Sequence, residues 1–87
     1  MIKTTNTDIL LDRISVDPAI CHGKPCVREC RIWVTLILDF LASGTSMEEL
    51  LAEYPDLQRE DILACIAYGS EMSRHRFVDW EEVAHVF

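Results

Sequence analysis

Three of the chain's four cysteines lie within the stretch CHGKPCVREC, which runs from Cys21 to Cys30. Thiols and an imidazole this close together are typical of zinc sites, redox centres and nucleophilic cysteines. A zinc site would be formed by Cys21, His22, Cys26 and Cys30. The C-x4-C-x3-C spacing, however, lacks the C-x-x-C pair of most zinc and redox motifs, and no second ligand pair follows it. We therefore expect no metal at this stretch.

The other chemistries that this stretch suggests are also incompletely specified. Gly23 and Lys24 resemble part of a phosphate-binding loop, but Pro25 stands where that motif needs serine or threonine. A cysteine nucleophile with His22 as its base stays open, although no third group that would orient the base is evident. The simplest interpretation places three cysteines in small apolar positions of the core: Cys26, Cys30 and Cys65. We expect a protein that is not an enzyme and has no cofactor.

Length and composition indicate one small globular domain. The chain has 87 residues, of which 49% are hydrophobic and 26% are charged. Its longest apolar stretch, residues 32–38, is far shorter than the roughly 20 residues that a membrane span needs. The first residues contain no basic flank leading into an apolar block, so we expect a cytoplasmic protein with reduced thiols.

The net charge of −7 is unevenly distributed along the chain. Acidic and basic residues balance between residues 1 and 42, whereas residues 43–87 contain ten acidic residues against Arg59, Arg74 and Arg76. Such a surface repels nucleic acid and attracts basic protein partners. Four of the acids also fall in the first turns of predicted helices, where the helix dipole favours negative charge: Glu48, Glu49, Glu60 and Asp61.

The sequence predicts a mostly helical domain with a small β region near its N-terminus. Residues 1–12 are polar and predict a loose arm. Short β segments are expected at residues 13–16, 25–27 and 31–34, within a β region that spans residues 13–34. Three helices are expected at residues 33–43, 46–54 and 58–74. Together they form a single domain over residues 1–75, followed by an amphipathic tail over residues 76–87.

Local signals define the ends of these helices. Gly44 is a typical residue after the last turn of the first predicted helix, and Ser46 with Glu49 forms a capping box for the second. Gln58 precedes the third, with Leu57 and Ile62 spaced as a hydrophobic staple. The predicted buried face of the third helix contains Ile62, Cys65, Ile66, Gly69 and Met72. Gly69 within that face predicts a close contact with another helix.

Two apolar surfaces have no evident partner within the domain. The first predicted helix is apolar almost all round, which predicts a homodimer that buries Trp33, Leu36, Ile37 and Phe40, or strand pairing near Ile14 and Val16. The tail places its apolar residues at near-helical spacing, which is typical of a segment that docks in a groove of a partner. The expected partner-binding residues are Phe77, Trp80, Val83 and Phe87. Alternatively, the tail packs on its own core as a further helix.

Several short runs together resemble a prokaryotic family, domain-of-unknown-function family 433. They are ISVDP (residues 14–18), GKPCV (23–27), R-I-x-V (31–34), LASG (41–44), MEELL (47–51), Y-P-x-L (54–57) and EDI (60–62). The resemblance covers about residues 13–72 in order and spacing. The sequence differs from the family's pattern at three places: His22 replaces a glycine, Glu29-Cys30 replaces Gly-Thr, and Gln58 replaces threonine or serine. CHGKPCVREC is then the β-turn scaffold of this family.

The resemblance implies a homeodomain-like, helix-turn-helix fold of three helices and a role as an antitoxin of the VapB type. Such a protein neutralises a PIN-like ribonuclease toxin, and it can regulate its own operon by binding operator DNA. The positions available for DNA binding are Arg13, Lys24, Arg28, Arg31, Gln58 and Arg59, although two acids in the first turn of the third helix face the phosphates. Alternatives are a small dimeric DNA-binding or scaffold protein without a toxin, and, less favoured, a metal-binding protein.

Overall fold

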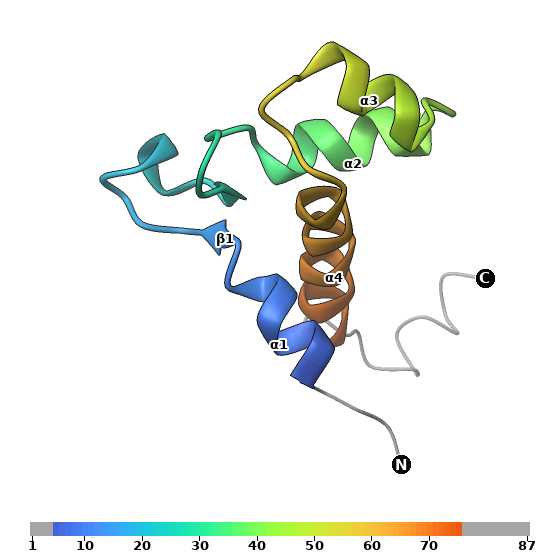
Figure 1. Cartoon of the computed structure of the whole chain (residues 1–87). Helices are drawn as coiled ribbons and strands as arrows, with labels where there is room; N and C mark the ends of the chain where they lie inside the picture. The colour runs from blue at the N-terminus through green and yellow to red at the C-terminus, as the bar shows by residue number, and fades with distance from the viewer. Residues whose placement is uncertain (1–4, 76–87) are drawn as a thin grey trace, which may run out of the picture.

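The computed structural model describes residues 5–75, and within them the chain is mostly helical (Figure 1). The elements in chain order are α1 (Thr5–Leu11), β1 (Ile14–Ser15), the 3-10 turn η1 (Cys21–Gly23), β2 (Cys26–Val27), α2 (Val34–Ala42), α3 (Met47–Glu53) and α4 (Arg59–His75). The three predicted helices correspond to α2, α3 and α4. In the part of the chain described, none of the helices has the length and apolar character needed to cross a membrane.

The helix α1 corrects the prediction of a loose arm at the N-terminus. This helix lies beside α4 (Figure 1), and the half-buried side chain of Leu10 packs against the core. Its sequence, TNTDILL, carries no strong helix-start signal, so the helix depends on tertiary contact with α4 more than on local propensity. The described part of the fold therefore has four helices where three were expected.

The predicted β region contains a two-stranded antiparallel sheet. Ile14 pairs with Val27 and Ser15 with Cys26. The third expected strand, residues 31–34, is reduced to an isolated bridge between Cys26 and Trp33. It cannot extend, because Arg31 has a left-handed φ of 59° and Val34 already begins α2.

The connection between α2 and α3 follows the sequence signals closely. Gly44 has a φ of +100°, and Thr45 N–H donates to Phe40 O at 3.0 Å, which is the Schellman arrangement. Ser46 Oγ accepts from Glu49 N–H at 3.0 Å, while the Glu49 carboxylate accepts from Ser46 N–H at 2.8 Å. The predicted helix end and capping box are both confirmed.

Helix α4 makes the close contact that Gly69 predicts, but its buried face differs from the predicted one. A Cβ atom at Gly69 would lie 3.2 Å from Leu38 Cδ1 of α2, so glycine permits this approach. Ile66 and Met72, predicted to be buried, are 45% and 36% exposed. The buried positions instead include Ala64, because α1 and α2 cover a stripe rotated from the predicted one.

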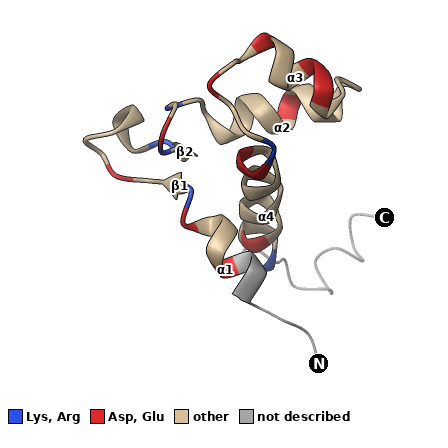
Figure 2. Ribbon diagram, viewed as in Figure 1, with Lys and Arg blue, Asp and Glu red and all other residues tan. Residues whose placement is uncertain are grey.

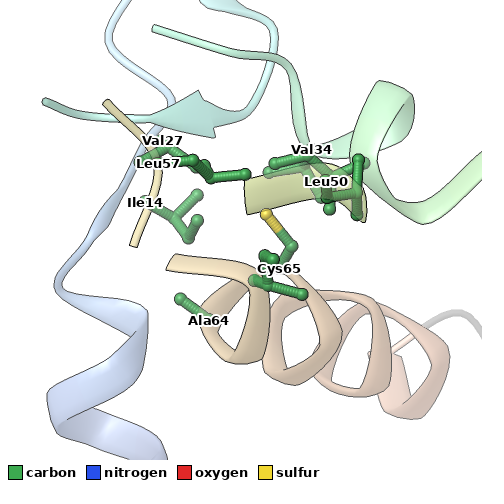
Figure 3. Packing of buried hydrophobic residues seen from close by; sticks show 9 residues of the cluster. Ile14, Val27, Val34, Leu50, Leu57, Ala64 and Cys65 are labelled. Atoms are coloured by element: carbon green, nitrogen blue, oxygen red, sulfur yellow. The ribbon is translucent and has the colours of Figure 1, made fainter. Parts of the chain in front are cut away.

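The core gathers residues from every region between β1 and α4 (Figure 3). Its buried members are Ile14, Val27, Val34, Ile37, Leu50, Leu57, Ile62, Ala64 and Cys65. Leu57 and Ile62, the predicted staple at the start of α4, both belong to it. The small cluster thus joins the sheet to all three C-terminal helices.

One buried charge joins the N-terminal segment to α4. The Asp61 side chain is only 3% exposed, and its Oδ1 accepts from Arg13 Nη1 at 2.9 Å. Its other oxygen, Oδ2, accepts from Gln58 N–H at 2.9 Å, which satisfies a free N–H at the start of α4. Gln58 Oε1 also lies 3.4 Å from Arg13 Nη1. Asp61 is therefore both a helix cap and the anchor of Arg13.

Replacing this carboxylate should destabilise the protein markedly. Asp61→Ala removes the cap and leaves Arg13 without its ion pair, so we expect a loss of about 2–3 kcal/mol in the free energy of unfolding. Asp61→Asn retains an acceptor and should lose about 1–2 kcal/mol. Glu60→Ala, a change at an exposed neighbour in the same turn, should stay within about 0.5 kcal/mol of the parent. Urea unfolding curves measure all three, and equal midpoints for Asp61→Ala and Glu60→Ala would contradict this role.

Candidate functional site

A polar pocket of about 480 Å³ lies where the N-terminal segment meets the start of α4. Its lining comes from α1, the turns next to β1 and β2, and the residue before α4: Ile9, Asp12, Arg13, Arg28, Glu29 and Gln58. Arg13 of this lining forms the ion pair with the buried Asp61. The fold thus brings together residues that are far apart in the sequence.

The two arginines of this pocket are held by the β hairpin and by Asp61. Arg28 Nη2 donates to Ile14 O at 3.2 Å, and Arg28 N–H donates to Arg13 O at 2.8 Å. Guanidinium groups are suited to phosphate or carboxylate ligands. Here the charges of the two arginines are matched by Asp12 and Glu29 in the same lining. The pocket is therefore polar but close to neutral, which limits its attraction for a polyanion.

The structure gathers three of the six residues predicted to bind DNA and leaves three elsewhere. Arg13, Arg28 and Gln58 line the polar pocket. Lys24 instead lies over the Trp33 ring, with Nζ 5.1 Å from the ring centroid. Arg59 Nη1 contacts Met47 Sδ at 3.1 Å. Arg31, the sixth, is exposed in the turn before α2.

Sequence reasoning missed Ile9, Asp12 and Glu29 of the pocket lining. Ile9 belongs to the segment that was expected to be a loose arm. Asp12 and Glu29 are exposed acids in turns, and their type and spacing carry no local signal. Only the docking of α1 on α4 reveals that they share a pocket.

The cysteines of CHGKPCVREC have mainly structural surroundings. Cys21 is half-buried, and its thiol donates to Arg31 O at 3.4 Å, while Cys26 is fully buried. Burial, reinforced by the neighbouring Cys21 thiol, raises the pKa of Cys26 to about 11. Burial likewise raises the pKa of Cys30, and burial with the nearby Asp61 charge raises that of Cys65 to about 12. Among residues 5–75, no group of three or more His, Cys, Asp or Glu side chains is placed to hold a metal ion.

The expected dimer surface is divided between exposed and buried residues. Trp33, Leu36 and Val16 are 42%, 37% and 53% exposed, so they remain available to a partner. Ile14 and Ile37 are 7% and 0% exposed because they fill the protomer's own core, and they are removed from that surface. The expected partner-binding residues Phe77, Trp80, Val83 and Phe87 lie outside the described residues.

Comparison with known proteins assigns the family. The pattern of the family described as Protein of unknown function (DUF433) matches residues 14–69, which include β1, β2 and most of α4. The chain belongs to the DUF433 family. Comparison with curated proteins gives no match.

A solved structure of another DUF433 protein has a similar fold. The crystal structure of a DUF433 member from Anabaena variabilis is 31% identical to this chain and superposes with a TM-score of 0.64. The match covers 77% of this chain and 66% of the Anabaena protein, so this DUF433 chain spans just under two thirds of that protein. The family pattern and the solved structure both confirm the family membership that the short runs of residues suggested.

The thiols of this DUF433 protein should differ sharply in reactivity. At about pH 8, Cys26 and Cys65 stay protonated in the folded protein, so iodoacetamide should modify them only after unfolding. Unfolding restores a thiol pKa near 9.0, so the unfolded state loses these protons first as the pH rises. The free energy of unfolding should therefore fall between about pH 9 and pH 12. Mass spectrometry of alkylated peptides checks the first point, and rapid labelling of Cys65 in the native protein would contradict it.

Proposed function

We propose that this protein is an antitoxin-like binding protein, not an enzyme, that neutralises a PIN-like ribonuclease toxin. The observation that supports the proposal is a group of exposed acidic residues on α2, on α3 and in the turn after α3, which we call the acidic surface; Figure 2 shows their positions along the ribbon. Its exposed members are Asp39, Glu48, Glu49, Glu53 and Asp56. None of the five forms an ion pair with another residue in the range 5–75.

The sequence supplies no basic residue to neutralise this surface locally, since no lysine or arginine occurs between residues 32 and 58. A ribonuclease binds RNA through a basic cleft, and an acidic protein surface is complementary to it. Exposed carboxylates without counter-ions repel nucleic acid, whose binding depends on neutralising phosphates. The charge pattern therefore favours a basic protein as the main partner.

Operator DNA is the second ligand in this proposal. In this proposal α3, α4 and the turn between them act as a helix-turn-helix of the homeodomain-like kind. The proposal is supported by Arg13, Arg28 and Gln58, which line one pocket beside the start of α4. Since Asp12 and Glu29 offset the arginines, the protein alone binds DNA weakly. A basic toxin bound to the acidic surface would strengthen the complex's affinity for DNA.

The proposed unit is a cytoplasmic homodimer. Trp33, the residue before α2, and Leu36 on α2 present exposed apolar area, and Phe40 is half-buried one turn further along the helix. Large apolar side chains that share one face of a helix and contact water are typical of association surfaces. Dimerisation would also double the acidic surface offered to toxin.

Toxin neutralisation can be tested with the product of the adjacent gene, if it encodes a small PIN-like ribonuclease. Co-expression with the full chain should restore growth, and the purified chain should inhibit RNA cleavage. Removing residues 76–87 should abolish inhibition while leaving the urea midpoint unchanged, because the predicted amphipathic tail serves the partner.

The control replaces Phe77, Trp80, Val83 and Phe87 together by serine, which keeps the chain length and should have the same effect as truncation. A fall of several kcal/mol in unfolding free energy on truncation would assign the tail to the protein's own core. Unimpaired RNA cleavage in the presence of the full chain would reject the antitoxin proposal and favour a scaffold protein without a toxin.

A further inference from the structure

A second pocket, of about 260 Å³, lies between the end of α2 and α3. Leu50 is buried in it, Phe40, Thr45 and Tyr54 are half-buried, and Glu49 and Glu53 are exposed. The volume exceeds the roughly 150 Å³ of an apolar cavity that holds benzene, yet it is below the range of about 300–1,000 Å³ typical of small-molecule sites. Its size suits one large apolar side chain from a protein.

The two carboxylates of this pocket make it receptive to a cation beside that side chain. Glu49 and Glu53 are four residues apart on α3 and therefore neighbours on one face, where their like charges repel each other. The Glu49 carboxylate is also fixed in place by the N–H of Ser46, at 2.8 Å. A partner that brings a lysine or arginine to this position would relieve the repulsion.

The chain itself has a large apolar side chain with a cation beside it at the opposite end of α2. Trp33, the residue before α2, is 42% exposed, and the ammonium group of Lys24 lies over its ring. Arg31 is exposed two residues earlier. An aromatic side chain accompanied by two cations thus stands at one end of α2, and an apolar pocket with two carboxylates stands at the other.

The spacing along α2 allows two copies to exchange these groups. Trp33, Leu36 and Phe40 follow an i, i+3, i+7 pattern, so they share one face of the helix. Trp33 and Phe40 are about 10 Å apart along the helix axis at 1.5 Å per residue, and Leu36 lies close to their midpoint. A two-fold axis beside Leu36 would place Trp33 of each copy opposite Phe40 of the other, which is the isologous arrangement of most dimers.

We propose that two copies of this protein associate through antiparallel α2 helices, with Trp33 of each inserted into the α2–α3 pocket of the other. Lys24 and Arg31 of one copy then face Glu49 and Glu53 of its partner. The protein's own tail suits the pocket poorly, because residues 77–87 contain three acids and no lysine or arginine. This inference rests on the homodimer part of the proposed function and adds its geometry and its charge pairing.

The test measures the mass of the full chain by sedimentation equilibrium over micromolar concentrations at about 0.1 M salt. The parent should be a dimer. Leu36→Glu should raise the dissociation constant at least 100-fold, because it places two like charges at the symmetry axis. Glu53→Lys and Lys24→Glu should each raise it about 10-fold, since each reverses a charge twice in the symmetric interface.

Charge exchange separates this pairing from a general effect of charge. The double variant Lys24→Glu with Glu53→Lys should recover the dissociation constant of the parent to within about 3-fold. Asp56→Lys, an exposed change of the same sign outside the pocket, should leave the constant unchanged. Circular dichroism confirms that each variant is folded, and the capping residue Glu49 is left intact in all of them.

A monomeric parent would overturn the inference and leave the pocket to a basic partner protein. The inference would also be overturned if Leu36→Glu left the dissociation constant of the dimer unchanged. It would likewise be overturned if the double variant had a dissociation constant as high as those of the two single variants. None of these outcomes decides whether the chain inhibits the ribonuclease. That inhibition is measured with the toxin, so failure of the dimer and failure of the antitoxin proposal remain distinguishable.

Discussion

The buried carboxylate of Asp61 is the constraint on which the arrangement of this protein depends. A charge that is 3% exposed must be fully partnered, and its partners here are the Arg13 guanidinium and the first free N–H before α4. Arg13 directly precedes β1, and its carbonyl group accepts from the Arg28 N–H across the hairpin. The direction of α4, the position of the sheet and the walls of the polar pocket therefore follow from one set of contacts.

The same ion pair shapes the electrostatics of the whole surface. Asp61 neutralises Arg13, which leaves Arg28 facing both Asp12 and Glu29 in the polar pocket, so this end of the protein offers no net positive charge to a polyanion. The five exposed acids over α2, α3 and their following turn have no such compensation within the described chain. A protein organised in this way presents one neutral, hydrogen-bonding end and one acidic end.

Features that depend on neighbouring residues could be predicted from the sequence, and features that depend on distant ones could not. The Schellman turn at Gly44, the box formed by Ser46 with Glu49, and the close approach at Gly69 each follow from local chemistry. The helix α1 and the pocket beside it required knowledge of what packs on α4. The pairing of Arg13 with Asp61 joins residues 48 positions apart, and no periodic pattern in the sequence indicates it. Ile66 is exposed where the sequence predicts burial for the same reason, since neighbouring helices decide which side of α4 is covered.

The turn η1 sets limits on how its sequence can vary. Cys21, His22 and Gly23 all have positive φ, at 53°, 58° and 84°, so three successive residues occupy left-handed backbone. Residues with a side chain lose about 1–2 kcal/mol there, and β-branched residues lose more. Histidine, asparagine and aspartate are the types that tolerate this region best after glycine. Histidine at position 22 is thus a side chain that this backbone accepts, whereas valine, isoleucine or threonine there would be strained.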